Sequence, residues 1–66
     1  MKYRVSIFGS CGELTVEADG PADAAEKSGF PLSLVWLAIT DPAGGYYTCR
    51  RGILFDETKG VEVLDL

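Results

Sequence analysis

Residues 2–18 read KYRVSIFGSCGELTVEA, and this stretch carries the clearest structural signal in the chain. Apolar and polar side chains alternate with a period of two in residues 2–8 and again in residues 13–18. Such alternation is typical of strands with one buried face. The intervening GSCG at 9–12 supplies glycines suited to a tight turn. The stretch therefore predicts a β-hairpin.

The register of this hairpin follows if Ser10 and Cys11 form the centre of the turn. Apolar side chains would then face one another on one side of the hairpin, and opposite charges would face one another on the other side. The predicted apolar pairs are Ile7 with Leu14, Val5 with Val16 and Tyr3 with Ala18, and the charged pairs are Arg4 with Glu17 and Lys2 with Asp19.

A short helix is predicted directly after the hairpin, in the sequence DGPADAAEKSG at 19–29. Asp19 or Gly20 can cap its first turn, and Pro21 suits the first helical position. Gly29 and Pro31 end the helix. Two helical turns are not stable alone, so this helix must pack against a sheet.

Residues 32–40 are mostly apolar and fit two structures, a helix or a central strand buried on both faces. Pro31 and Pro42 bound the run closely, which favours a strand over residues 33–40. The glycine-containing residues 41–45 then form a hairpin loop.

The remainder of the chain is predicted to be β-rich. A strand over residues 46–51 continues past Gly52 into residues 53–55, with Gly52 as a bulge or a strand break. A turn at 56–60 leads into a last strand at 61–66, in which the alternation of apolar and polar residues is imperfect.

The resulting element order is ββαβββ. It predicts an α+β fold in which an antiparallel sheet packs against one short helix. The 66 residues suffice for a single domain, 1–66, and a chain of this size buries too little surface to enclose a deep pocket.

The composition excludes most kinds of catalytic site. Histidine, which is the usual general base near neutral pH and the commonest metal ligand, is absent. Cys11 and Cys49 do not have the spacing of a zinc site, and the sequence leaves open whether they pair. We therefore predict that the protein is not an enzyme and holds no metal or cofactor.

The sequence predicts a soluble, cytoplasmic protein. The longest stretch without a charged residue spans residues 28–40, and a membrane helix needs roughly 18 apolar residues. The first uncharged run, residues 5–12, is too short and too polar for a secretory signal.

The charge of the chain restricts its partners. Ten acidic residues against six basic ones give a net charge of −4. Phosphate binding needs a basic surface, so this balance argues against direct nucleic-acid binding and against anionic membranes. It favours a protein partner with a basic surface.

The acids are concentrated in two stretches of the sequence. Residues 13–26 contain five acids and no base, and residues 56–65 contain four acids and one lysine. Carboxylates held on a rigid sheet and helix could imitate a row of phosphates, or they could simply keep a small protein soluble. The acids predicted to bind a partner are Glu13, Glu17, Asp19, Asp23, Glu26, Asp56 and Glu57.

Trp36, Tyr46 and Tyr47 are the residues most typical of protein interfaces. The two tyrosines would face opposite sides of a strand, so one is expected in the core and the other at a contact surface. Tyr47 is the predicted contact residue, and Trp36 is expected in the core. Arg50 and Arg51 also face opposite sides. One would balance acids across the sheet and the other would mark a contact point, and structural ion pairing is favoured.

In size, acidity and element order the chain resembles the small phage-encoded anti-CRISPR proteins. The opening MKYRVSIFG, the short PADAAEKSG helix and the hairpin-rich remainder carry this resemblance along the whole chain. Within that group it is most similar to inhibitors of type I systems, type I-C among them. These proteins share no catalytic signature, so the resemblance assigns no site residue.

The resemblance implies a stoichiometric inhibitor, expected to be a monomer in the bacterial host cytoplasm. It would bind an RNA-guided CRISPR-Cas surveillance complex through acidic side chains that stand in for DNA phosphates, and so block target DNA binding. The alternative is a non-enzymatic protein-interaction module or a small subunit of a larger bacterial assembly. That alternative predicts an exposed apolar patch around Tyr46, Tyr47 or the last strand.

Overall fold

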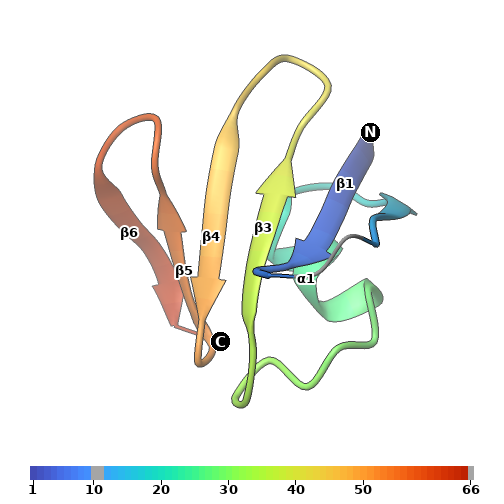
Figure 1. Ribbon diagram of the computed structural model, residues 1–66. Helices are drawn as coiled ribbons and strands as arrows, with labels where there is room; N and C mark the ends of the chain where they lie inside the picture. Colours follow the sequence, from blue (N-terminus) through green and yellow to red (C-terminus); the bar gives the residue numbers. More distant parts are fainter. Residues whose placement is uncertain (10–11, 66) are drawn as a thin grey trace.

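The computed structural model describes residues 1–9 and 12–65, which form a six-stranded antiparallel sheet and one helix (Figure 1). The strand order is β2-β1-β3-β4-β5-β6. These findings confirm the predicted α+β class, the antiparallel sheet and the short helix. The elements are β1 (Lys2–Ile7), β2 (Leu14–Glu17), α1 (Pro21–Lys27), β3 (Trp36–Thr40), β4 (Tyr46–Arg50), β5 (Ile53–Asp56) and β6 (Val61–Asp65).

The β1–β2 hairpin has the predicted buried face but a different register. Tyr3 lies opposite Val16, and Val5 lies opposite Leu14, so the predicted pairing was wrong by two residues. An even shift keeps every side chain on its face of the sheet. Lys2 consequently lies opposite Glu17, where Asp19 was expected.

The connection between β1 and β2 is longer than the predicted two-residue turn. The last pair of the hairpin is Val5 with Leu14. On its other edge β1 continues beside β3, where the Phe8 N–H donates to the Trp36 carbonyl at 3.0 Å. The predicted turn centre, Ser10 and Cys11, lies outside the described residues.

Helix α1 begins and ends where the sequence predicts. Its N-cap is Gly20, and the Asp23 carboxylate accepts a hydrogen bond from the Asp19 N–H at 3.1 Å. Asp23 thereby satisfies a backbone donor at the helix start, in the manner of a capping box. At the other end, Gly29 adopts a φ of 79°, a conformation that favours glycine.

The apolar run at 32–40 forms a strand only in its second part, Trp36–Thr40. Leu34 donates to the Pro31 carbonyl in a turn that precedes the strand. Leu37 and Ile39 are fully buried, whereas Trp36 is 46% exposed. The prediction of a core tryptophan was therefore wrong, because this strand is buried on one face rather than on both.

The long strand predicted through Gly52 is broken into β4 and β5. Arg51 and Gly52 both adopt positive φ angles, 51° and 86°. Two consecutive positive φ angles are what a two-residue hairpin turn requires. The predicted order ββαβββ therefore becomes ββαββββ, and of the two alternatives for Gly52 the strand break is correct.

Strand β6 contains an irregularity that explains its imperfect alternation. Leu54 pairs with Leu64, but Phe55 pairs with Glu62, so Val63 is an extra residue in the ladder. Such a bulge shifts the side-chain alternation by one position. Val61 and Leu64 consequently point to the same side of the sheet.

The hydrophobic core lies between α1 and one face of the sheet. Its largest fully buried side chains come from the sheet, and Ala24 and Ala25 of α1 pack against them. Figure 1 shows α1 beside β1 and β3, far from the β6 edge. The largest fully buried side chains of the sheet are Tyr3, Val5, Leu37, Ile39, Cys49 and Leu54.

Candidate functional site

The face of the sheet opposite α1, called the open face below, presents most of its side chains to solvent. Side chains alternate between the two faces along each strand, so the residues next to a core residue in sequence point away from the helix and belong to the open face. Trp36 is 46% exposed and Tyr46 is 38% exposed on this face. Its members on the four central strands are Lys2, Arg4, Ser6, Trp36, Ala38, Thr40, Tyr46, Thr48, Arg50, Ile53 and Phe55.

Three large side chains are packed together at one end of the open face. The Arg50 guanidinium carbon lies 4.3 Å from the centre of the Trp36 ring, in a cation–π contact. The Phe8 ring meets Trp36 edge to face, with ring centres 6.1 Å apart. These contacts fix the orientation of an exposed tryptophan and of an arginine that forms no ion pair within the part of the chain that the structure describes.

The centre of the open face is shallow because its side chains are small. Ser6, Ala38 and Thr48 lie side by side on β1, β3 and β4. A cavity of about 290 Å³, called the aromatic groove below, has Thr48 in its lining but neither Ser6 nor Ala38. Its lining consists of Phe8, Trp36, Tyr46, Thr48, Cys49, Arg50 and Glu57.

One polar contact organises the border of the aromatic groove. The Thr48 hydroxyl donates to the Glu57 carboxylate at 2.7 Å. A second cavity, of about 330 Å³, shares Thr48, Arg50 and Glu57 with the first and extends to Ile53 and Phe55. The two cavities therefore form a continuous shallow surface with a polar middle, Thr48, Arg50 and Glu57, between aromatic side chains on one side and Ile53 and Phe55 on the other.

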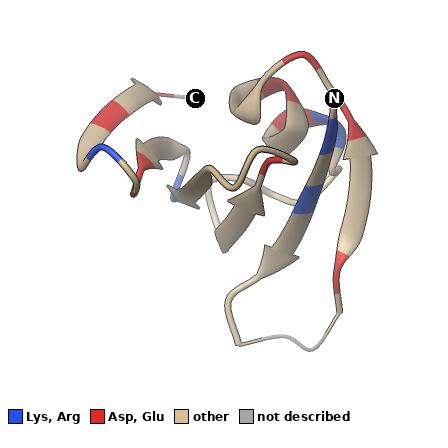
Figure 2. Cartoon of the chain, turned by 90° about the horizontal axis from the view of Figure 1, so that it is seen from above, with Lys and Arg blue, Asp and Glu red and all other residues tan. Residues whose placement is uncertain are grey.

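The predicted partner-binding acids fall into separate places. Glu17, Asp19, Asp23 and Glu26, called the acidic group below, come from β2, from α1 and from the residues between them. Figure 2 shows red segments on α1, on β2 and between them. Glu13 lies at the other end of β2, 3.8 Å from the Arg4 guanidinium.

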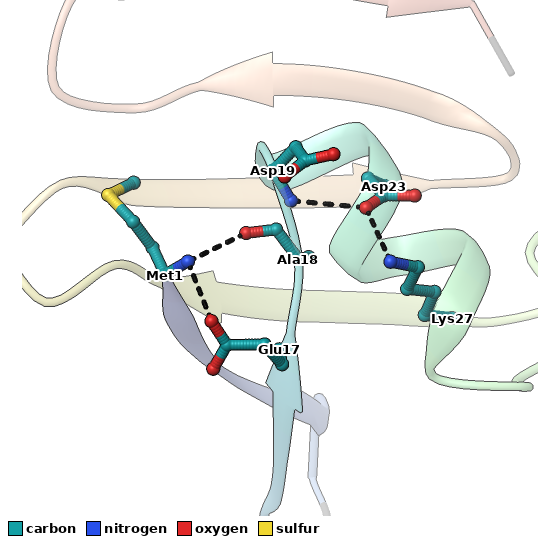
Figure 3. A network of polar contacts seen from close by, with 6 residues as sticks. All are labelled: Met1, Glu17, Ala18, Asp19, Asp23 and Lys27. Carbon is teal, nitrogen blue, oxygen red and sulfur yellow. Dashed lines mark hydrogen bonds and ion pairs between the residues drawn. The ribbon is translucent and has the colours of Figure 1, made fainter.

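Within the acidic group, two carboxylates are already paired (Figure 3). The Met1 amino group lies 3.0 Å from Glu17 and also donates to the Ala18 carbonyl at 3.0 Å. Lys27 lies 3.0 Å from Asp23. Hydrogen bonds from the Asp19 N–H and from Lys27 lower the pKa of Asp23, and Asp23 in turn raises the pKa of Lys27.

The other two members of the acidic group are free. Asp19 and Glu26 are exposed, and their carboxylates form no hydrogen bond or ion pair with any described residue. The base-free stretch of sequence is thus partly neutralised in space by Met1 and Lys27, and two carboxylates remain available.

Of the remaining predicted residues, Glu57 lines the aromatic groove, whereas Asp56 and Tyr47 occupy structural positions. Asp56 is 7% exposed and accepts hydrogen bonds from the N–H groups of Thr58 and Lys59 in the turn before β6. Tyr47 is half-buried on the helix side of the sheet, where its hydroxyl lies 3.4 Å from Asp41. Burial and the nearby carboxylates of Asp41 and Asp56 raise the pKa of Tyr47.

The exposed residues Phe8, Trp36, Tyr46 and Arg50 were not among the predicted contact residues. A period-two signal could have found three of them. Leu37, Ile39 and Cys49 occupy the buried positions of β3 and β4, so Trp36 and Arg50 must face the opposite side. Tyr46 follows from Arg50 by the same parity, four residues earlier on β4.

The free thiol of Cys49 is buried, and burial raises its pKa, so it is not activated as a nucleophile. Among the residues described, no group of three or more acidic or cysteine side chains could hold a metal ion, and no helix is long and apolar enough to cross a membrane. No protein-family model, curated protein or solved structure matches the chain.

Proposed function

We propose that this protein is a non-enzymatic binding module that contacts a protein partner through its open face. The observation that carries the proposal is the exposure of Trp36, Tyr46 and Arg50 around the aromatic groove. Tryptophan, tyrosine and arginine are the residue types that dominate the binding energy of protein interfaces.

The groove fits a partner that inserts an aromatic or apolar side chain with a polar group beside it. A shallow cavity of about 290 Å³ has room for one or two side chains, and its lining combines the rings of Phe8, Trp36 and Tyr46 with the charged groups of Arg50 and Glu57. The edge-to-face contact with Phe8 and the cation–π contact with Arg50 hold Trp36 in place before binding. Little side-chain entropy is then lost when a partner docks, which favours affinity.

The test begins with a photo-crosslinker on the groove. Tyr46→benzoylphenylalanine in the native cell would capture the partner, which is then purified and titrated with the unmodified protein. We expect the double variant Trp36→Ala/Tyr46→Ala to bind roughly 100-fold or more weakly, because two hot-spot residues are removed. The matched control is Leu34→Ala, which truncates a 78% exposed leucine away from the groove and should change affinity less than about threefold. Equal affinity of the double variant and the control would overturn the proposal.

A second proposal rests on the acidic group. We propose that Asp19 and Glu26, as free and exposed carboxylates beside Glu17 and Asp23, mimic phosphates in an inhibitor of a type I CRISPR-Cas surveillance complex. Such an inhibitor would reach a basic DNA channel by electrostatic steering and compete with target DNA.

This second proposal is tested with a purified type I-C surveillance complex and labelled target DNA. Equimolar protein should abolish DNA binding, and Asp19→Lys/Glu26→Lys should restore it. The control Glu62→Lys/Asp65→Lys makes the same change in net charge at β6 and should leave inhibition intact. Inhibition that survives in the Asp19→Lys/Glu26→Lys variant, or that is absent in the unmodified protein, contradicts phosphate mimicry.

A further inference from the structure

Strand β6 forms one edge of the sheet, and all five of its residues are exposed. The outer side of an edge strand presents backbone N–H and C=O groups that have no neighbouring strand. Such an edge is a template on which an extended segment of another protein can add as a further strand.

The bulge at Val63 sorts the side chains of β6 into two chemically different rows. Val61 and Leu64 pair with Asp56 and Leu54 and lie on the helix side of the sheet. Glu62 pairs with Phe55, and Asp65 pairs with Ile53, so both carboxylates lie on the open face. The edge therefore presents an apolar row on one side and an acidic row on the other.

The charges of this edge are not neutralised within the protein. Throughout residues 1–9 and 12–65, neither Glu62 nor Asp65 forms an ion pair or a side-chain hydrogen bond. If two copies paired antiparallel through β6, Glu62 and Asp65 of both copies would place four carboxylates at the interface. Like charges across a strand pair are destabilising. The edge thus disfavours a second copy of itself and favours a strand of opposite charge.

We propose that β6 is a docking edge for a partner strand in which basic residues alternate with apolar ones. The basic side chains would face Glu62 and Asp65, and the apolar side chains would face Val61 and Leu64. Backbone hydrogen bonds would supply part of the affinity, and the two rows would select the sequence. This site is separate from the aromatic groove and from the acidic group, and it does not depend on either function proposed above.

The test uses a synthetic seven-residue peptide of alternating lysine and valine, titrated into isotope-labelled protein and followed by NMR. We expect the largest shifts at the β6 amides, and slower hydrogen exchange there. An alternating glutamate–valine peptide should bind at least tenfold more weakly. A peptide of the same lysine and valine content, with the two residues in separate blocks, should also bind at least tenfold more weakly, because it cannot match both rows.

Variants of the protein complete the test. Glu62→Lys/Asp65→Lys should bind the alternating lysine–valine peptide at least tenfold more weakly and the alternating glutamate–valine peptide more tightly. Asp19→Lys/Glu26→Lys has the same net charge and should bind both peptides with the affinity of the unmodified protein. If the first variant does not fold, Glu62→Gln/Asp65→Asn should show the same loss in smaller measure. The proposal is overturned by shifts centred on α1 and β2, by equal binding of the block peptide, or by self-association through β6 in sedimentation equilibrium.

Discussion

The two faces of the β3–β4 pair are built from alternate residues of the same ten, yet their chemistry is opposite. On one face Leu37, Ile39 and Cys49 are fully buried against the layer that contains α1. On the other face Trp36 and Arg50 lie in contact with each other and exposed to solvent. In this small protein, alternate residues of the same two strands form the core and the exposed face. Residues for stability and residues for binding therefore do not need separate segments of the chain.

The largest expected difference between the faces is in folding stability. Leu37→Ala should lower the free energy of unfolding by about 2–5 kcal/mol, because it leaves a cavity in the core. Trp36→Ala should lower it by about 1 kcal/mol or less, since only its contacts with Phe8 and Arg50 are lost. Urea denaturation followed by circular dichroism measures both. A loss at Trp36 as large as that at Leu37 would show that the open face also belongs to the core.

The rate at which a reagent labels the Cys49 thiol tests how well the buried face is protected from solvent. In a Cys11→Ser background, we expect labelling of the Cys49 thiol by iodoacetamide to be roughly 10³-fold slower than in urea-unfolded protein, because the thiol reacts only after an opening of the core. The control is Tyr46→Cys in a background lacking Cys11 and Cys49, which places a thiol at a 38% exposed position beside the aromatic groove. Slower labelling at 46 than at 49 would reverse the assignment of the two faces.

Alkaline pH should lower the free energy of unfolding through a residue of the buried face, Tyr3. Burial, together with the carboxylates of Asp41 and Asp19, raises the pKa of Tyr3 above its ordinary value of 10.0. A phenol with a raised pKa in the folded state keeps its full stabilising contribution below pH 10 and loses it as the pH rises through the folded-state pKa. The urea midpoint should therefore fall above pH 10, and less steeply for Tyr3→Phe. Identical slopes for the two proteins would show that Tyr3 does not contribute to this loss.

The smallest expected effect concerns the start of the helix that covers the buried face. The pKa of Asp23 is lowered by the Asp19 N–H and by Lys27. The contribution of the ionised Asp23 carboxylate to folding stability is fully present above its ordinary pKa of 3.8, and it is lost as the pH falls through the lowered pKa. Asp23→Asn should slightly reduce the thermal midpoint at pH 7 and flatten its fall between pH 4 and 2, while partner binding at the open face stays unchanged. A loss of binding in this variant would connect the two faces.

Local patterns in the sequence predicted the elements whose signals are local. The alternation in β1 and β2 identified the buried face, and Pro21 and Gly29 located the ends of α1. The hairpin register was not predictable in this way, because the predicted and observed registers differ by two residues and place the same side chains on the buried face.

The candidate surfaces were less predictable than the fold. The exposure of Trp36 could not be predicted from the apolar run around it. A strand that is buried on both faces and a strand with one exposed aromatic face have similar compositions. The charge of the acidic group was overestimated from sequence for a related reason. Met1 and Lys27 lie outside the base-free stretch of residues, and only the folded chain brings them to Glu17 and Asp23.

The strand order also has a consequence for the kinetics of folding. From β3 to β6 the strands follow one another in the sheet as they do in sequence, so this meander can form through short loops. Among the strand pairs of residues 1–9 and 12–65, only that of β1 with β3 joins distant residues, such as Val5 with Ile39. Closing that long loop is the costly step and is expected to limit the folding rate. Until it closes, the β3 edge with Leu37 and Ile39 is open to other chains, so the N-terminal hairpin also serves as the protection of the nascent protein against aggregation.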